Sequence, residues 1–125
     1  MEDEFRHFCV VRQEHLNHHG SLFGGHLLAI IDEMAYVACV RTYPGHNFVT
    51  KALKDVEFHV PAHLGDVLET HAKLEQVGRT SCQIRVQVFI SEAMDEKRRL
   101  SFDGLVVLVC VDSQGVPTEV SRRKI

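Results

Sequence analysis

The feature that most constrains the fold is one apolar stripe of helical period near residue 30. Apolar residues recur there at i, i+3, i+4, i+7, i+8 and i+11, and they are Leu27, Ile30, Ile31, Met34, Ala35 and Ala38. This spacing places all six on one side of an α-helix. Pro44-Gly45 then ends the element. The chain therefore has one long helix with which to build a core.

The other apolar segments have the character of strands. They cover residues 5–12, 48–60, 67–77, 80–91 and 105–111. Within 80–91, apolar and polar residues alternate, which indicates a strand with one buried face. Every residue of 105–111 is apolar, so both faces of that strand should be covered. Gly78-Arg79 indicates a hairpin turn, and the charged residues 93–99 indicate a solvated loop.

This order of one strand, one helix and four strands on short turns predicts an α+β fold. Consecutive strands on short turns pair in antiparallel fashion, and one helix covers only one face of their sheet. The uncovered face and the apolar strand 105–111 then require a partner. We therefore expect a homodimer or a higher even-numbered oligomer, such as a tetramer or hexamer.

Composition excludes several function classes. With 125 residues and no linker or repeat, the chain is expected to form a single domain over 1–125. Its net charge of −3 argues against nucleic-acid binding, and two Tyr without Trp offer little for base stacking. The longest apolar runs are too short to span a membrane. Glu2, Asp3 and Glu4 replace the basic start of a signal peptide, so we expect a cytoplasmic protein.

The segment before the helix holds the residues best suited to chemistry. A polar loop containing Asn17 runs into Gly24-Gly25 at the predicted start of the helix. Free backbone N–H groups and the positive end of the helix dipole lie at such a place. Without Cβ atoms, the two glycines let a ligand approach closely, and a carbonyl oxygen could develop charge there. The Asn17 amide could orient water or substrate, or it could serve only as a turn residue.

Asp32 is the candidate acid. Its position is about 120° from the centre of the apolar stripe, next to Leu28 and Cys39, so we expect a poorly hydrated carboxylate. It could act as a general base or as a nucleophile. The alternative is a solvated helix acid, and the neighbouring Glu33 is the weaker catalytic candidate.

The pattern Asn17-x-x-Gly20-x-x-Phe23-Gly24-Gly25, followed by Ile31-Asp32, resembles the signature of hotdog-fold acyl-CoA thioesterases. Phe23 makes it most similar to the YciA-like bacterial enzymes and the related eukaryotic acyl-CoA hydrolases. Further segments resemble the family in the same order: Phe58-x-x-Pro61, Gly65-Asp66, Gly78-Arg79-Thr80-Ser81 and Asp112-x-x-Gly115-x-Pro117.

This resemblance implies a hotdog fold, in which an antiparallel sheet wraps around one long central helix. It implies hydrolysis of an acyl-CoA thioester to a free acid and coenzyme A, which is part of the substrate and not a cofactor. Asn17 and Asp32 would be catalytic, in a site that two subunits share, and Gly24 and Gly25 would polarise the carbonyl. The residues expected to bind substrate or coenzyme A are Phe23, Gly78, Arg79, Thr80 and Ser81.

Three other functions remain open at this point. A hotdog hydratase or dehydratase would need a histidine and an acid on the central helix. A non-catalytic acyl-CoA-binding or regulatory hotdog module would use the same binding residues. A metal-binding protein is suggested by His15, His18, His19 and His26, but their spacing matches no zinc motif, so we expect no metal.

Overall fold

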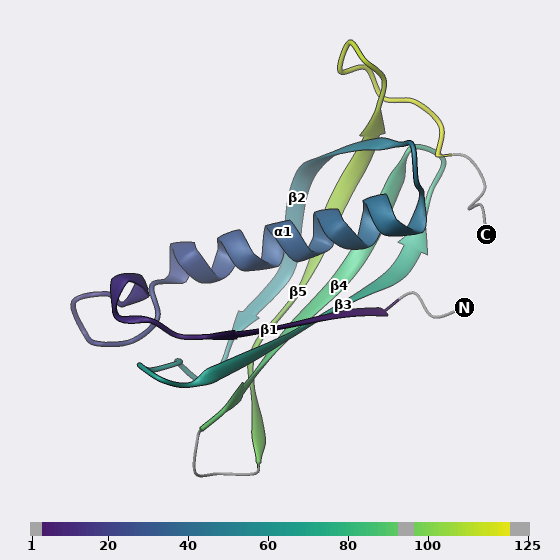
Figure 1. The fold of residues 1–125 in the computed structure, drawn as a ribbon. Coiled ribbons are helices and arrows are strands. Elements are labelled where there is room, and N and C mark those ends of the chain that lie inside the picture. The colour runs from purple at the N-terminus through teal and green to yellow at the C-terminus, as the bar shows by residue number, and fades with distance from the viewer. Residues whose placement is uncertain (1–3, 93–96, 121–125) are drawn as a thin grey trace.

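The computed structural model describes residues 4–92 and 97–120 (Figure 1). Strand β1 (Glu4–Val10) leads through a short 3-10 helix, η1 (Gln13–His15), to the helix α1 (Gly24–Thr42). Four strands follow: β2 (Asn47–Phe58), β3 (Val67–Val77), β4 (Ser81–Ser91) and β5 (Arg98–Val111).

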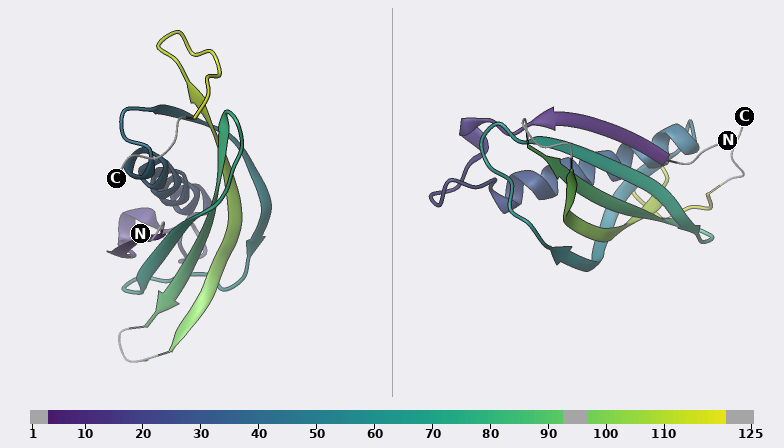
Figure 2. Two further views of the ribbon diagram at one scale, coloured as in Figure 1. Left: turned by 90° about the vertical axis from the view of Figure 1, so that its right-hand side faces the viewer. Right: turned by 90° about the horizontal axis from the view of Figure 1, so that it is seen from below.

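In the described part of the chain, the strands form one antiparallel sheet in the order β1-β3-β4-β5-β2. Strands β1 and β2 are therefore its two edges. The sheet curves around α1, which lies across its concave face (Figure 2). The α+β hotdog architecture predicted from the sequence is confirmed, and β2 becomes an edge because it pairs only with β5, the last strand.

The core lies between α1 and the inner face of the sheet. On the helix, Ile31, Ala35 and Ala38 are fully buried, and the alternating residues of β4 from Cys82 to Ile90 are equally inaccessible. Burying a Val, Leu or Ile side chain contributes about 1.5–3 kcal/mol. The helical stripe and the strand alternation are thus the two apolar surfaces that pack together.

Strand β5 differs from its prediction in where it begins and in what covers it. It begins at Arg98 rather than at residue 105, so the end of the predicted loop 93–99 is strand, while residues 93–96 lie outside the described part. Arg98 pairs with Ser91 of β4, and this pairing overrides the charged composition. Within 105–111, all residues except Val107 are buried in the single chain. The chain itself provides part of this cover, because the following segment turns back and Thr118 N–H donates to the Cys110 carbonyl.

Candidate active site

The loop between η1 and α1 is organised around Asn17. The side-chain oxygen of Asn17 accepts hydrogen bonds from the backbone N–H groups of His19 (2.8 Å) and Ser21 (3.2 Å). Gly20 has a φ of 81°, a left-handed conformation that favours glycine. The turn role considered for Asn17 is therefore real. These hydrogen bonds use the side-chain oxygen of Asn17. The side-chain amide nitrogen, which is a donor, takes no part in them.

The start of α1 presents two glycine N–H groups. Phe23 is the N-cap residue and makes no side-chain capping bond, and both Gly24 and Gly25 are exposed. Within residues 4–92 and 97–120, neither glycine N–H has a hydrogen-bond acceptor. A Cβ on Gly25 would lie 2.5 Å from the Phe23 ring, so glycine is required for the ring to rest there. The helix start is thus an open pair of donors beside an exposed aromatic ring.

Asp32 lies two turns further along α1 and is bound to a residue that the sequence analysis did not identify. Thr50 of β2 donates a hydrogen bond from its hydroxyl to the Asp32 carboxylate at 2.5 Å. Its position could have been found from strand alternation, because Phe48 and Thr50 share the inner face of β2. This bond fixes one carboxylate oxygen and leaves the other available.

The expectation that Asp32 would be poorly hydrated is wrong for the single chain, in which it is exposed. Leu28 and Cys39 do lie inward, half-buried and buried respectively. The helix flank that carries Asp32, however, faces the edge strand β2, and the described residues place no further strand beyond it. Asp32 therefore lies open at this edge of the described chain.

Asn17 and Asp32 do not meet within one chain. Asp32 lies eight residues beyond Gly24, which is about 12 Å along the helix axis at 1.5 Å per residue. No hydrogen bond between Asn17 and Asp32 exists among the described residues. The single chain thus places the Asn17 loop just before the glycine pair at the helix start and, separately, forms an Asp32–Thr50 pair.

The predicted coenzyme A residues form the turn between β3 and β4. Gly78 N–H donates to the Ser81 carbonyl at 2.8 Å, and Arg79 is exposed. Thr80 and Ser81 line a groove of about 390 Å³ together with Lys51 and Thr50. The residue that holds Asp32 and two of the predicted binding residues therefore border the same groove, whereas Phe23 lies at the start of α1.

The described residues contain no group of three His, Cys, Asp or Glu side chains placed to hold a metal ion. The four histidines before and in α1 form two ring pairs instead, His15 with His26 and His18 with His19. The four cysteines form no disulfide, and a hydrogen bond with the Cys82 thiol, together with burial, raises the pKa of Cys39. No helix of the described part is long and apolar enough to cross a membrane.

Comparison with known proteins decides the family. The sequence profile of the thioesterase superfamily matches residues 19–97, which include the Asn17 loop from His19 onward, the glycine pair, Asp32 and Thr50. The chain belongs to the thioesterase superfamily. The match begins after Asn17 and ends just before β5.

Among curated thioesterase relatives, an uncharacterized acyl-CoA thioester hydrolase of Zymomonas mobilis is 32% identical over 104 residues, covering 83% of this chain and 69% of that protein. The uncharacterized acyl-CoA thioester hydrolase YkhA of Bacillus subtilis is 30% identical over 106 residues, covering 85% and 61%. This thioesterase-superfamily chain therefore spans 61–69% of the length of these two relatives.

Solved thioesterase structures agree with the fold. The acyl-CoA hydrolase of Staphylococcus aureus, in complex with butyryl coenzyme A, coenzyme A and coenzyme A disulfide, superposes with a TM-score of 0.87 at 30% identity, covering 95% of this chain and 72% of that one. Alanine variants of that enzyme at an asparagine, an aspartate and a threonine have also been solved. An apo-hexameric acyl-CoA thioesterase superposes with a TM-score of 0.89 at 30% identity, covering 95% and 76%.

Proposed function

We propose that this protein is an acyl-CoA thioesterase, which hydrolyses an acyl-CoA thioester to a free acid and coenzyme A. The observation that carries the proposal is the Asp32–Thr50 hydrogen bond on the flank of a helix whose first two N–H groups are unpaired. The residue types altered in the Staphylococcus aureus hydrolase are those of Asn17, Asp32 and Thr50. The asparagine and aspartate are separated by the same number of residues in both chains.

The donors at the helix start and the Asp32–Thr50 pair have different roles in thioester cleavage. Gly24 and Gly25 N–H donate to the thioester carbonyl oxygen, and the Asn17 amide nitrogen adds a third donor to it or to the attacking water. Losing one such donor commonly lowers turnover about 10²–10³-fold, because charge grows on that oxygen in the transition state. As a general base, Asp32 deprotonates a water that attacks the carbonyl carbon and displaces the coenzyme A thiolate. As a nucleophile, it displaces the same thiolate itself and forms a mixed anhydride, which water then hydrolyses to the free acid and the regenerated carboxylate.

A second copy of the chain completes the site. Because Asp32 is exposed at the β2 edge, pairing of two copies at that edge brings the Asn17 loop of one to the Asp32 of the other. Strand β2 exposes several large apolar side chains that such pairing would bury, namely Val49, Leu53, Val56 and Phe58. The hexameric assembly of a structural neighbour supports a homodimer or a higher even-numbered oligomer.

The substrate's coenzyme A portion follows the groove along Thr80 and Ser81. Arg79 and Lys51 supply positive charge for its phosphates, and Gly78 shapes the turn. Phe23 packs against the acyl thioester at the helix start. No metal and no additional cofactor takes part in these steps, no nucleic acid or membrane is a partner, and we place the protein in the cytoplasm.

A panel of acyl-CoA esters with free-thiol detection tests the proposal. We expect thiol release that is lost in Asp32→Asn and kept in Glu33→Gln, the matched change at the next acid of the same helix. Formation of an unsaturated product without thiol would identify the hydratase or dehydratase alternative. Binding of acyl-CoA without turnover by the wild-type chain would identify the non-catalytic binding module.

A further inference from the structure

Two histidine rings join the Asn17 loop to the start of α1. His15 of η1 and His26 of the first helical turn stack with their ring centroids 3.6 Å apart and their planes within 10° of parallel. The His15 carbonyl also accepts the Phe23 N–H at 2.8 Å. Residues 16–22, which carry Asn17, form a loop that is closed by backbone contacts of its own, the Asn17 N–H bond to the Ser21 carbonyl (2.7 Å) and the Leu16–Leu22 bridge, while the His15–His26 stack and the Phe23 N–H bond join its two ends to the helix start.

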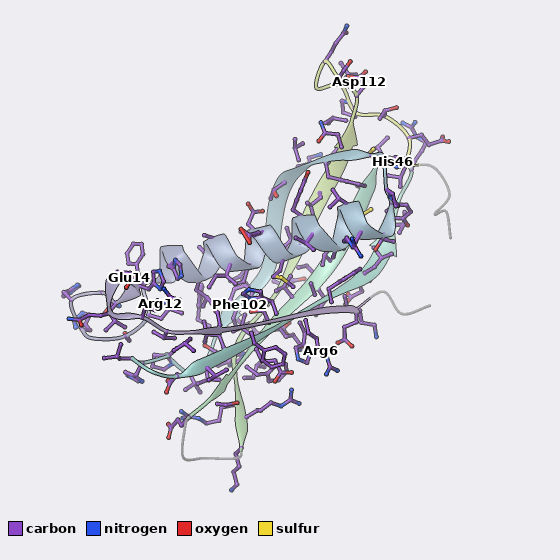
Figure 3. The ribbon with its side chains drawn as sticks, in the orientation of Figure 1. Arg6, Arg12, Glu14, His46, Phe102 and Asp112 are labelled. Carbon is purple, nitrogen blue, oxygen red and sulfur yellow. The ribbon has the colours of Figure 1, made fainter. Side chains whose placement is uncertain are left out.

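The stack lines a groove of about 570 Å³ between β1 and α1, and neither Asp32 nor Thr50 lines this groove. The charged and titratable groups of this region come from each element around it. They are His7 and Cys9 of β1, Arg12 and Glu14 before and in η1, and Glu33 of α1. Figure 3 shows Arg12 and Glu14 at the N-terminal end of the helix.

Protonation of His26 opposes its stacking on His15. Burial and the adjacent His15 lower the pKa of His26 below its ordinary value of 6.5, and Glu14 opposes them only in part. Two imidazolium rings at stacking distance repel each other, and the positive end of the α1 dipole lies next to both. The stacked pair is therefore an arrangement of rings that are not both charged.

We propose that the His15–His26 stack is a pH-sensitive positioning pair for Asn17. When the rings are not both charged, they hold the Asn17 loop against the Gly24-Gly25 donors, and when both rings are protonated they separate and the loop withdraws. The consequence for turnover rests on the proposed thioesterase function, whereas the movement of the loop does not.

The direction of the pH effect on the loop follows from the number of protons that each state of the loop binds. The released loop, with an ordinary histidine, binds more protons than the held loop, in which the pKa of His26 is lowered. The held state is therefore fully favoured above about pH 6.5, and the preference is lost as the pH falls through the lowered pKa. Each proton taken up on release changes the opening equilibrium by about tenfold per pH unit within this window.

Amide hydrogen exchange tests the loop without any substrate. We expect the protection factors of the His19, Ser21 and Phe23 amides, corrected for the intrinsic exchange rate, to fall between about pH 7.5 and pH 5. His26→Phe should keep them protected at the lower pH, because a phenylalanine ring can stack on His15 and does not titrate. His46→Phe, at the opposite end of the helix, is the control and should respond as the wild type does.

Turnover gives the second readout. In the wild type, kcat should fall more steeply than KM rises as the pH drops below about 6.5, and His26→Phe should remove that fall. His26→Ala, which has no ring to stack, should have a low kcat at every pH. His15→Phe repeats the test from the other side of the stack if His26→Phe fails to fold.

The outcomes separate the two proposals. If loop protection changes with pH as described but neither the wild type nor any variant releases thiol, the pH-sensitive positioning pair is supported and the proposed thioesterase function is refuted. If thiol is released but the wild type and the phenylalanine variants share the same loop protection and the same acid fall in kcat, the positioning pair is refuted.

Discussion

Replacing Thr50 by valine removes the hydroxyl that holds Asp32 and keeps the shape of the side chain. The bond is a short one, 2.5 Å, to a charged acceptor. Such bonds contribute about 1.5–3 kcal/mol when desolvated, and we take about 1–1.5 kcal/mol here because both partners are exposed in the single chain. Since about 1.4 kcal/mol corresponds to a tenfold change in rate, Thr50→Val should lower kcat by about five- to tenfold.

The assay is thiol release at saturating acyl-CoA, with KM and the thermal unfolding midpoint measured on the same samples. KM should change less than about threefold, because the lost hydrogen bond orients the Asp32 carboxylate and not the substrate. The free energy of unfolding should fall by no more than about the same 1–1.5 kcal/mol, because the hydrogen bond is also present in the resting folded protein. Thr50→Ser, which restores the hydroxyl, is the matched control. Wild-type kcat in folded Thr50→Val, or an equal loss in the serine variant, would refute a positioning role.

Three further predictions concern the shared site, the assembly and acid stability. Asn17→Ala should lower turnover about 10- to 1,000-fold, and mixing it with inactive Asp32→Asn should restore part of the activity; absence of rescue despite verified subunit exchange would contradict a site shared between copies. Sedimentation should give an even multiple of 14.2 kDa, and a monomer at micromolar concentration would contradict it. Hydrogen bonds from His71 and Arg98 lower the pKa of Glu69 below 4.5, so their contribution to the free energy of unfolding is present above that pH and lost as the pH falls through the lowered pKa. In urea unfolding, the free energy of unfolding of Glu69→Gln should therefore fall less with decreasing pH than that of the wild type. An equal fall in the two proteins would contradict Glu69 as the source of the acid destabilisation.

Local patterns were sufficient for most elements of the fold. The stripe from Leu27 to Ala38 predicted α1, and the alternation around Ile84 predicted β4, because each periodicity reflects burial on one side of its own segment. The start of β5 could not be predicted in this way. Arg98 and Arg99 gave that segment the composition of a loop, yet they form ion pairs with Glu69 and Glu92 once the strand pairs with β4.

The sequence alone indicated most of the residues that we propose for catalysis, although not Thr50. Asn17, the Gly24-Gly25 pair and Asp32 lie within one short stretch, so their loop and helix positions follow from local propensity. Only the tertiary structure decided what these residues touch. Thr50 reaches Asp32 because β2 pairs with the distant strand β5 and becomes an edge beside the helix, and that same edge leaves Asp32 exposed. The His15–His26 stack likewise depends on how the chain enters α1. Contacts of this kind arise from the packing of separate segments, which no periodicity within one segment records.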